Sequence, residues 1–341
     1  MTPSLGRSTG VVAALLLAAS TLTGCGLLDG STHLEEALEY LPSDTTLVTF
    51  VDRARIADRL DLGDVRTGAS DDDVSRWLDA IKGDYGTSLS PFTGVMQEAA
   101  FSDFDVEWEA LGSGRSATAW VWKMSDDLDF DKVAADLVDA GYERSGPSSH
   151  PAFHADLAAS DETGLIGGRY PSRLADLVLV PDEEIVISGR HADDIAKVAT
   201  DDADSLADKG SYDDLLAQAD HQGDLEYATL GFPTRSQGLA PNPGPDCTPG
   251  GLALFVPTDQ KVRTVRLFDG STAEKDATAD ADAMKSYLDD WNERYDLGIA
   301  FDVTAVGPAV LIESGFGDRG VLTRAFQRFE GPFGCPPTEA S

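Results

Sequence analysis

The side chains best suited to metal binding or acid–base catalysis in this sequence are its histidines. There are five, namely His33, His150, His154, His191 and His221. Only His150 and His154 share a short motif, HPAFH, and they stand four residues apart, as two zinc-binding imidazoles on one helical face do. Pro151 disfavours a regular helix between them, and no Glu occupies the position of the catalytic base of a zinc protease. The pair is more typical of surface histidines, and we predict no metal site here.

Motifs for nucleophilic or phosphoryl chemistry are missing from the body of the chain. After residue 25 the sequence contains no Gly-x-Ser-x-Gly turn and no Gly-x-x-x-x-Gly-Lys loop, and no cysteine is paired with a histidine in a recognisable motif. We therefore predict that the protein is not an enzyme, that it has no catalytic residues and that it needs no cofactor.

Carboxylates are abundant enough for a calcium site to be considered. The segment DLDFDK places Asp127, Asp129 and Asp131 at alternating positions, as in the first half of an EF-hand loop. However, Lys132 stands where that loop needs Gly, and Val138 stands where it needs a bidentate Glu. We predict that these aspartates cap a helix and bind no metal.

Two tryptophans are the candidates for facing a ligand. Trp120 and Trp122 lie two residues apart in an apolar segment, so they share one face if that segment is a strand. Two neighbouring indoles can stack a sugar or line a cleft. They can equally form the core beneath a helix, because buried aromatic side chains dominate core energetics. The sequence favours the core and leaves the ligand site as the alternative.

The first cysteine has a distinctive context. Arg7 precedes the apolar run VVAALLLAAS, and TLTGC follows it, which is the order of a secretory signal. Leu22-Thr23-Gly24-Cys25 resembles a bacterial lipobox. That resemblance implies a signal peptide over residues 1–24 and Cys25 as the lipidated mature amino terminus, with a short tether to residue 32. An uncleaved anchor, or an ordinary signal peptide with a free Cys25, is the alternative.

The other two cysteines agree with an exported protein. Once Cys25 is assigned to the lipid, only Cys247 and Cys335 are left, and both lie in Pro/Gly-rich segments. A disulfide between them is the simplest pairing outside the cytoplasm. It would tie the C-terminal tail to the body of the protein.

The charge of the chain excludes some partners. Its 341 residues carry a formal net charge of −34, which becomes −34 − 1 = −35 for the side chains when residues 1–24, including Arg7, are removed. Such a surface repels nucleic acid and anionic lipid head groups. We therefore expect no nucleic-acid partner, and we expect contact with the membrane to depend on the anchor.

Hydrophobic patterns divide the body into alternating strands and helices. Strands are predicted at 45–52, 116–124, 250–257 and 261–270, hairpins at 175–190 and 302–315, and helices at 71–86, 129–141, 191–200, 277–296 and 318–329. A strand–helix–hairpin–helix order appears twice, and short hairpins imply antiparallel pairing. We predict an α+β fold made of duplicated antiparallel units with helices on one face. The first region is 33–222, and the second is 223–341, closed by the Cys247–Cys335 disulfide.

Three segments carry a second resemblance. LPSDTTLVTFVD (41–52), DEEIVISGRHADDIAKVA (182–199) and SLADKGSYDDLLAQ (205–218) are similar to a family of bacterial envelope proteins of unknown function. That family is built from tandem α+β units and has no established catalytic residues. The resemblance implies the fold and adds little about function.

Together these features predict a lipoprotein anchored at the outer face of the cell membrane. Its expected role is non-catalytic binding or structure in the envelope, with envelope proteins or wall material as partners. The alternative is the solute receptor of an importer, although the chain lacks the parallel βαβ units usual in such receptors. A hydrolase is the least favoured class, because no catalytic group is recognisable.

Overall fold

The computed structural model describes residues 32–63, 65–81, 86–114, 118–157, 164–190, 192–200, 202–210, 212–219, 225–232, 249–258 and 261–336. All of them belong to one compact unit, Ser31–Ser341. Cys25 and Cys247 lie outside the described residues, so the predicted lipidation site and disulfide stay predictions. The region boundary predicted at residues 222 and 223 also falls outside these ranges.

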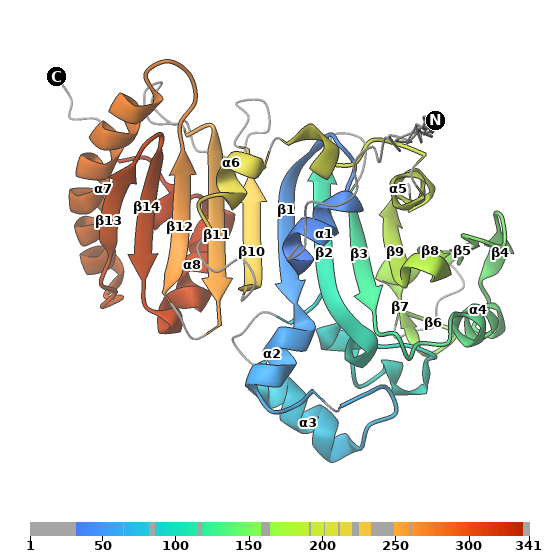
Figure 1. Cartoon of the computed structure of the whole chain (residues 1–341). Helices are drawn as coiled ribbons and strands as arrows, with labels where there is room; N and C mark the ends of the chain where they lie inside the picture. Colours follow the sequence, from blue (N-terminus) through green and yellow to red (C-terminus); the bar gives the residue numbers. More distant parts are fainter. Residues whose placement is uncertain are drawn as a thin grey trace, which may run out of the picture. The chain divides into compact units, whose positions relative to one another are not determined.

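A 12-stranded sheet is the centre of this unit, and every pairing in it is antiparallel (Figure 1). In sheet order its strands are β13 (Asp302–Val306), β14 (Ala309–Ser314), β12 (Val262–Leu267), β11 (Gly251–Pro257), β10 (Leu225–Gly231), β1 (Thr45–Asp52), β2 (Val106–Gly114), β3 (Thr118–Met124), β9 (Ile185–Arg190), β8 (Asp176–Val180), β5 (Ala152–His154) and β4 (Glu143–Ser145). A second sheet contains only β6 (Leu165–Ile166) and β7 (Tyr170–Pro171). The predicted antiparallel α+β class is confirmed.

The strand connectivity repeats on the two sides of the central β1–β10 pair. From β1 outward the order is β1, β2, β3 and then the hairpin partners β9 and β8; from β10 outward it is β10, β11, β12 and then β14 and β13. In each half a helix separates the third strand from the hairpin, and another helix follows the hairpin. We call the side of the sheet that begins with β1 the first half and the side that begins with β10 the second half.

Helices pack against both faces of the sheet. The α-helices are α1 (His33–Glu39), α2 (Arg53–Arg59), α3 (Asp71–Ala80), α4 (Phe130–Asp139), α5 (Ala192–Ala199), α6 (Asp213–Leu216), α7 (Ala273–Tyr295) and α8 (Arg319–Arg328). The 3₁₀ turns are η1 (Ser90–Phe92), η2 (Met96–Glu98), η3 (Asp103–Asp105), η5 (Ser172–Leu174), η6 (Pro181–Glu183), η7 (Ala207–Lys209), η9 (Phe316–Asp318) and η10 (Gly331–Phe333). We predicted helices on one face. The strands explain the difference, because all seven residues of β10 and all seven of β11 are buried, which requires cover on both sides.

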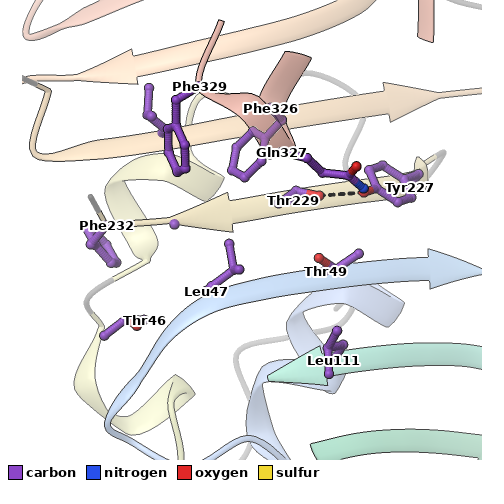
Figure 2. Close-up of a pocket in the computed structure, with 12 residues that line it drawn as sticks. Thr46, Leu47, Thr49, Leu111, Tyr227, Thr229, Phe232, Phe326, Gln327 and Phe329 are labelled. Atoms are coloured by element: carbon purple, nitrogen blue, oxygen red, sulfur yellow. Dashed lines mark hydrogen bonds between the residues drawn. The ribbon is translucent and has the colours of Figure 1, made fainter. Parts of the chain in front are cut away.

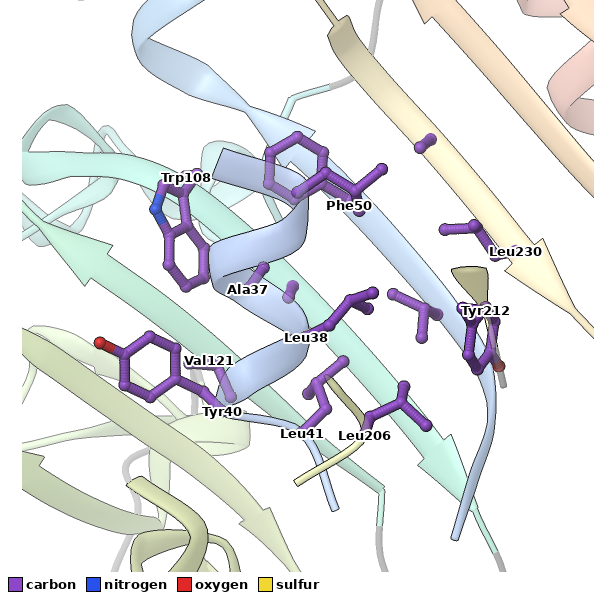
Figure 3. Packing of buried hydrophobic residues seen from close by; sticks show 14 of the residues in the cluster. Ala37, Leu38, Tyr40, Leu41, Phe50, Trp108, Val121, Leu206, Tyr212 and Leu230 are labelled. Atoms are coloured by element: carbon purple, nitrogen blue, oxygen red, sulfur yellow. The ribbon is translucent and has the colours of Figure 1, made fainter. Parts of the chain in front are cut away.

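One face, here called the α1 face, carries Val48 and Phe50 of β1. Leu34 and Leu38 of α1 pack against it in a single cluster that also includes Trp108 of β2. Figure 3 shows Ala37 and Leu38 over the strands that carry Phe50 and Trp108. Helices α5 and α6 extend this cover, so the α1 face is apolar and covered over the central strands of both halves.

The opposite face, here called the α8 face, carries Leu47 and Thr49 of β1. Its cover consists of two separate clusters, one beneath α2, α3, α7 and α8 and the other beneath α4 and the turns η1 and η2. Leu47 is only partly buried, and Thr49 and Leu111 of β2 are likewise half-exposed. The helical cover therefore thins above the central strands, and the candidate site lies there.

Candidate functional site

A groove of about 350 Å³ opens on the α8 face where β1 pairs with β10 (Figure 2). Strands β1, β2, β10 and β11 form its floor, and the last turn of α8 forms a wall. Its lining consists of Thr46, Leu47, Thr49, Leu111, Tyr227, Thr229, Gly231, Phe232, Leu252, Phe326, Gln327 and Phe329. This volume lies within the range of about 300 to 1,000 Å³ that is typical of small-molecule sites.

The strand register explains why these side chains meet. Leu47 is directly opposite Gly231, and Thr49 is opposite both Thr229 on β10 and Leu111 on β2. Directly opposed residues of an antiparallel pair point to the same face. The floor therefore brings together β1 and β10, whose opposed residues Leu47 and Gly231 are 231 − 47 = 184 positions apart in the sequence.

Gly231 keeps the floor of the groove low. A Cβ atom at this position would lie 3.2 Å from Cδ1 of Leu47 and 3.8 Å from Cζ of Phe326, so it would point into the space between strand and helix. A larger side chain here would fill the groove. The size of the cavity thus depends on this residue having no side chain.

Phe326 and Phe329 form the aromatic wall at the end of α8. Phe326 is buried and contacts Phe333, with ring centroids 4.8 Å apart, which fixes the position of its ring. Phe329 caps the helix in a left-handed conformation, with φ of 52°. For a bulky residue this conformation costs roughly 1 to 2 kcal/mol. The helix end is therefore held in a strained turn directly beside the groove.

Hydroxyl groups form a polar cluster at one end of the groove. Thr229 Oγ1 donates a hydrogen bond to the Tyr227 hydroxyl at 2.8 Å, and Thr49 also hydrogen-bonds with Tyr227. Burial raises the pKa of Tyr227 to about 12, so the phenol is neutral at physiological pH. Figure 2 shows Gln327 extending from α8 toward this cluster. The groove therefore combines an apolar length with one uncharged polar end.

A second, polar cleft of about 390 Å³ lies at the other end of β1, where α1 and α2 begin. His33 Nδ1 is 2.8 Å from Oδ2 of Asp52, and this hydrogen bond raises the pKa of the imidazole. The Asp52 carboxylate also accepts from the backbone N–H of Arg55, so it caps α2. Arg59, which lines the same cleft, forms an ion pair with buried Glu226. His33, Asp52 and Arg59 thus have charged partners within the protein, and this cleft is the weaker candidate for a ligand site.

Three carboxylates are buried at the start of β2. Asp103 accepts hydrogen bonds from Trp77 Nε1 at 2.7 Å, from Ser90 Oγ at 3.0 Å and from Thr87. Glu109 accepts from the Ser88 backbone at 2.8 Å and from Trp122 Nε1 at 2.6 Å, and Asp105 accepts from the Ser102 backbone and from Thr67. Burial raises the pKa of Glu109 to about 7 and also raises that of Asp105. These donors belong to the protein, so this cluster fixes the fold rather than a ligand.

The predicted tryptophan pair lies on the α8 face but not in the groove. Trp122 is fully buried and donates to Glu109, as the core interpretation expects. Trp120 is half-buried, and the guanidinium of Arg173 lies 5.8 Å from its ring centroid. Directly opposite Trp120 on β2 is Leu111, which does line the groove.

The other candidate residues have ordinary structural partners. Asp129 caps α4 by accepting from the Lys132 backbone at 3.0 Å, as predicted. His154 pairs with Asp176 at 2.6 Å on the surface, and within the described ranges no cluster of ligands suits a metal ion. Cys335 is half-buried just after η10, and its predicted pairing with Cys247 stays a prediction.

Sequence reasoning missed the groove because it missed β10. The segment LEYATLG is short and has no clear alternation, and no local signal indicates that it pairs with β1. Gly231 is the clearest clue in retrospect, because a Gly at the end of an apolar strand often marks the close approach of another group.

Comparisons with known proteins add little to the site. The sequence matches no protein-family model, and no curated protein gives a match. A solved structure titled "Structure of crystal form I of TP0453" aligns with this chain at a TM-score of 0.39 and 8% identity, over 84% of this chain and 96% of that chain. No helix within the described ranges has the length and apolar character needed to cross a bilayer.

Proposed function

We propose that this protein is an extracytoplasmic lipoprotein that binds an apolar ligand in the groove between α8 and the β1–β10 pair, without covalent chemistry. The observation that carries the proposal is the groove itself. Leu47, Leu111 and Phe326 line a space of about 350 Å³ that the helices of the α8 face leave uncovered. A concave, mostly apolar pocket with a few convergent polar groups is the usual form of a small-molecule site.

The proposed anchor places this site near a membrane. If Cys25 is lipidated, residues 26–32 connect it to the start of α1, and seven residues span at most about 25 Å. The body would then lie close to the outer face of the bilayer, within reach of lipids, envelope proteins and wall material. Its negative charge would keep the surface away from anionic head groups.

Binding of a fluorescent apolar probe tests the groove. N-phenyl-1-naphthylamine should bind the wild-type chain with one site, and Gly231→Leu should weaken this binding at least about tenfold because the new side chain fills the cavity. Leu111→Trp is a second variant on the opposite side of the groove. Val306→Leu, on exposed β13, is the matched control and should bind as the wild type does.

The outcome that contradicts this part of the proposal is equal probe binding by the wild type and both groove variants. Circular dichroism should first show that each variant is folded. Loss of binding in the Val306→Leu control would also count against the groove, since that residue is remote from it.

The anchor has its own test. Cys25→Ser should leave the precursor unprocessed or release the protein from the membrane, because this thiol alone follows the apolar run and the small residues. Membrane fractionation and intact mass measure the result. A Cys25→Ser chain that still carries acyl mass would disprove the proposed lipidation site. Non-reducing peptide mapping tests the proposed Cys247–Cys335 disulfide, and free thiols at both positions would refute it.

A further inference from the structure

We infer that the groove takes an uncharged amphiphile with one alkyl chain and a hydroxyl-bearing head, such as a monoacylglycerol. The inference rests on the proposed function and adds the chemical class of the ligand. It follows from three features of the lining: its lack of charge, the state of its hydroxyl groups and its volume.

The lining carries no formal charge. Among the twelve described residues that line the groove there is no Asp, Glu, Lys, Arg or His. A charged head group entering this space would lose hydration without gaining a partner of opposite charge, which is costly. An anionic head would in addition be repelled by a chain of net charge −34. The part of the ligand that enters the groove is therefore neutral.

The polar end offers more acceptors than donors. A hydroxyl has one donor and two acceptor lone pairs. The Thr229 donor is already used on Tyr227, and Tyr227 shares a second hydrogen bond with Thr49, so this end of the cluster presents oxygen lone pairs. Gln327 adds an exposed amide that both donates and accepts. These groups suit a ligand hydroxyl, which donates as well as accepts, better than a carboxylate, which only accepts.

The apolar length suits a single chain. Leu47, Phe232, Phe326 and Phe329 line the space away from the hydroxyl cluster, on both the strand side and the helix side (Figure 2). A volume of about 350 Å³ is at the lower end of the range for ligand sites. A ligand with two full-length chains would have to leave one of them outside the groove.

Ligands of equal chain length and different head charge test the inference. The full-length protein is titrated with monomyristoylglycerol and with the myristate anion, each below its aggregation concentration, and displacement of N-phenyl-1-naphthylamine is followed. The neutral glyceride should bind at least about tenfold more tightly than the anion. Gly231→Leu should abolish displaceable binding of both, which assigns the signal to the groove.

Variants of the polar end should reduce the preference for the glyceride over the myristate anion but keep the groove able to bind the probe. The double variant Tyr227→Phe/Thr229→Val keeps the shape of the lining and removes two hydroxyls, so the preference for the glyceride should fall below about threefold while the probe still binds. Gln327→Leu changes an exposed side chain, so the variant should fold as the wild type does and should weaken glyceride binding more than probe binding.

The two proposals fail in different ways. Probe binding that is unaffected by Gly231→Leu removes the proposed function together with the inference. Probe binding that depends on the groove, with myristate bound as tightly as the glyceride, overturns the inference alone. An unchanged preference in both polar-end variants would also overturn it.

Discussion

The two halves of the sheet share their strand connectivity but differ in the groups that hold their buried charges. In the second half, Arg266 on β12 is fully buried and is matched by Asp280 on α7, with bonds of 2.7 and 3.0 Å to the two carboxylate oxygens. It also donates to the backbone oxygens of Pro332 and Gly334, at 3.1 and 2.8 Å. One residue thus holds strand, helix and C-terminal tail together.

In the first half, buried carboxylates are held mainly by neutral donors. Asp103 and Glu109 accept from hydroxyl, indole and backbone groups. A cation, Arg53, is buried nearby, but its guanidinium lies over the ring of Trp77, 4.5 Å from the centroid, and its Nε and Nη2 atoms make no hydrogen bond. Burial lowers the pKa of Arg53. A buried carboxylate paired with a cation keeps its charge when the pH changes mildly. A buried carboxylate held only by neutral donors can take up a proton over the same pH range.

The halves also differ in where the α-helix that follows the hairpin packs. Helix α5 follows the hairpin of the first half and packs on the α1 face, with Ile195 and Ala196 beside Ile187. Helix α8 follows the corresponding hairpin but packs on the α8 face, with Phe326 beside Leu252. This change of face provides the wall of the groove, so the candidate site exists because the repeat is imperfect.

The largest expected effect is at the matched pair. Arg266→Met should lower the free energy of unfolding by about 3 to 5 kcal/mol, because it leaves the Asp280 carboxylate buried without its partner. The double variant Arg266→Met/Asp280→Leu should recover most of the loss. Urea denaturation of the two variants measures the difference. A single variant as stable as the double one would show that Asp280 does not depend on Arg266.

The next effect depends on pH and distinguishes the first half. The Glu109 pKa, raised from 4.5 to about 7, means that the native state binds an extra proton between these values, so its contribution to stability falls as pH rises from 4.5 to 7. The expected fall is up to about 3 kcal/mol. Glu109→Gln should remove it.

Urea midpoints of wild type and Glu109→Gln at pH 4.5 and pH 8 measure this effect. The variant should become more stable relative to the wild type when the pH is raised from 4.5 to 8. Glu98→Gln, on an exposed turn, is the control and should show no such change. A constant difference between wild type and Glu109→Gln at the two pH values would place the Glu109 pKa near its usual range.

A smaller loss should follow removal of one neutral donor. Ser90→Ala deletes the hydroxyl that donates to Asp103 at 3.0 Å and leaves the bonds from Trp77 and Thr87 in place. Hydrogen bonds to charged groups contribute about 1.5 to 3 kcal/mol, and the remaining donors favour the lower end of that range. Thermal unfolding monitors the change. No change in midpoint would mean that Trp77 and Thr87 suffice.

The smallest effect is expected at the half-exposed pair between His33 and Asp52. The raised pKa of His33 gives a stabilisation that is complete below about pH 6.5 and is lost as pH rises through the native pKa of the imidazole. His33 is 43% exposed, so solvent screening should hold the effect below about 1 kcal/mol. The free energy of unfolding of His33→Gln, compared with that of the wild type at pH 6 and pH 9, measures the effect. The variant should be destabilised more at pH 6 than at pH 9, and a destabilisation that grows with pH would contradict the prediction.

Local sequence patterns predicted much of the architecture and none of the groove. The strand expected at 45–52 is β1, and the predicted hairpin at 175–190 contains β8 and β9, because alternation and turn residues are local signals. The groove depends on Leu47 meeting Gly231, a long-range pairing that periodicity cannot specify. Arg266 was missed for another reason: an arginine in a strand is usually exposed, and this one is buried by α7 and the C-terminal tail, whose positions the local sequence does not indicate.

The pairing of β1 with β10 also delays completion of the sheet during synthesis. Leu47 and Gly231 are 231 − 47 = 184 residues apart, so during synthesis β1 emerges long before its partner. At about 5 to 20 residues per second, this interval is about 10 to 40 s. Throughout that time a nascent first half would present the open edge of β1, which can template pairing with foreign strands. The sheet cannot be completed before β10 has been synthesised. Keeping the nascent chain unfolded until then would therefore protect the edge of β1 from pairing with foreign strands.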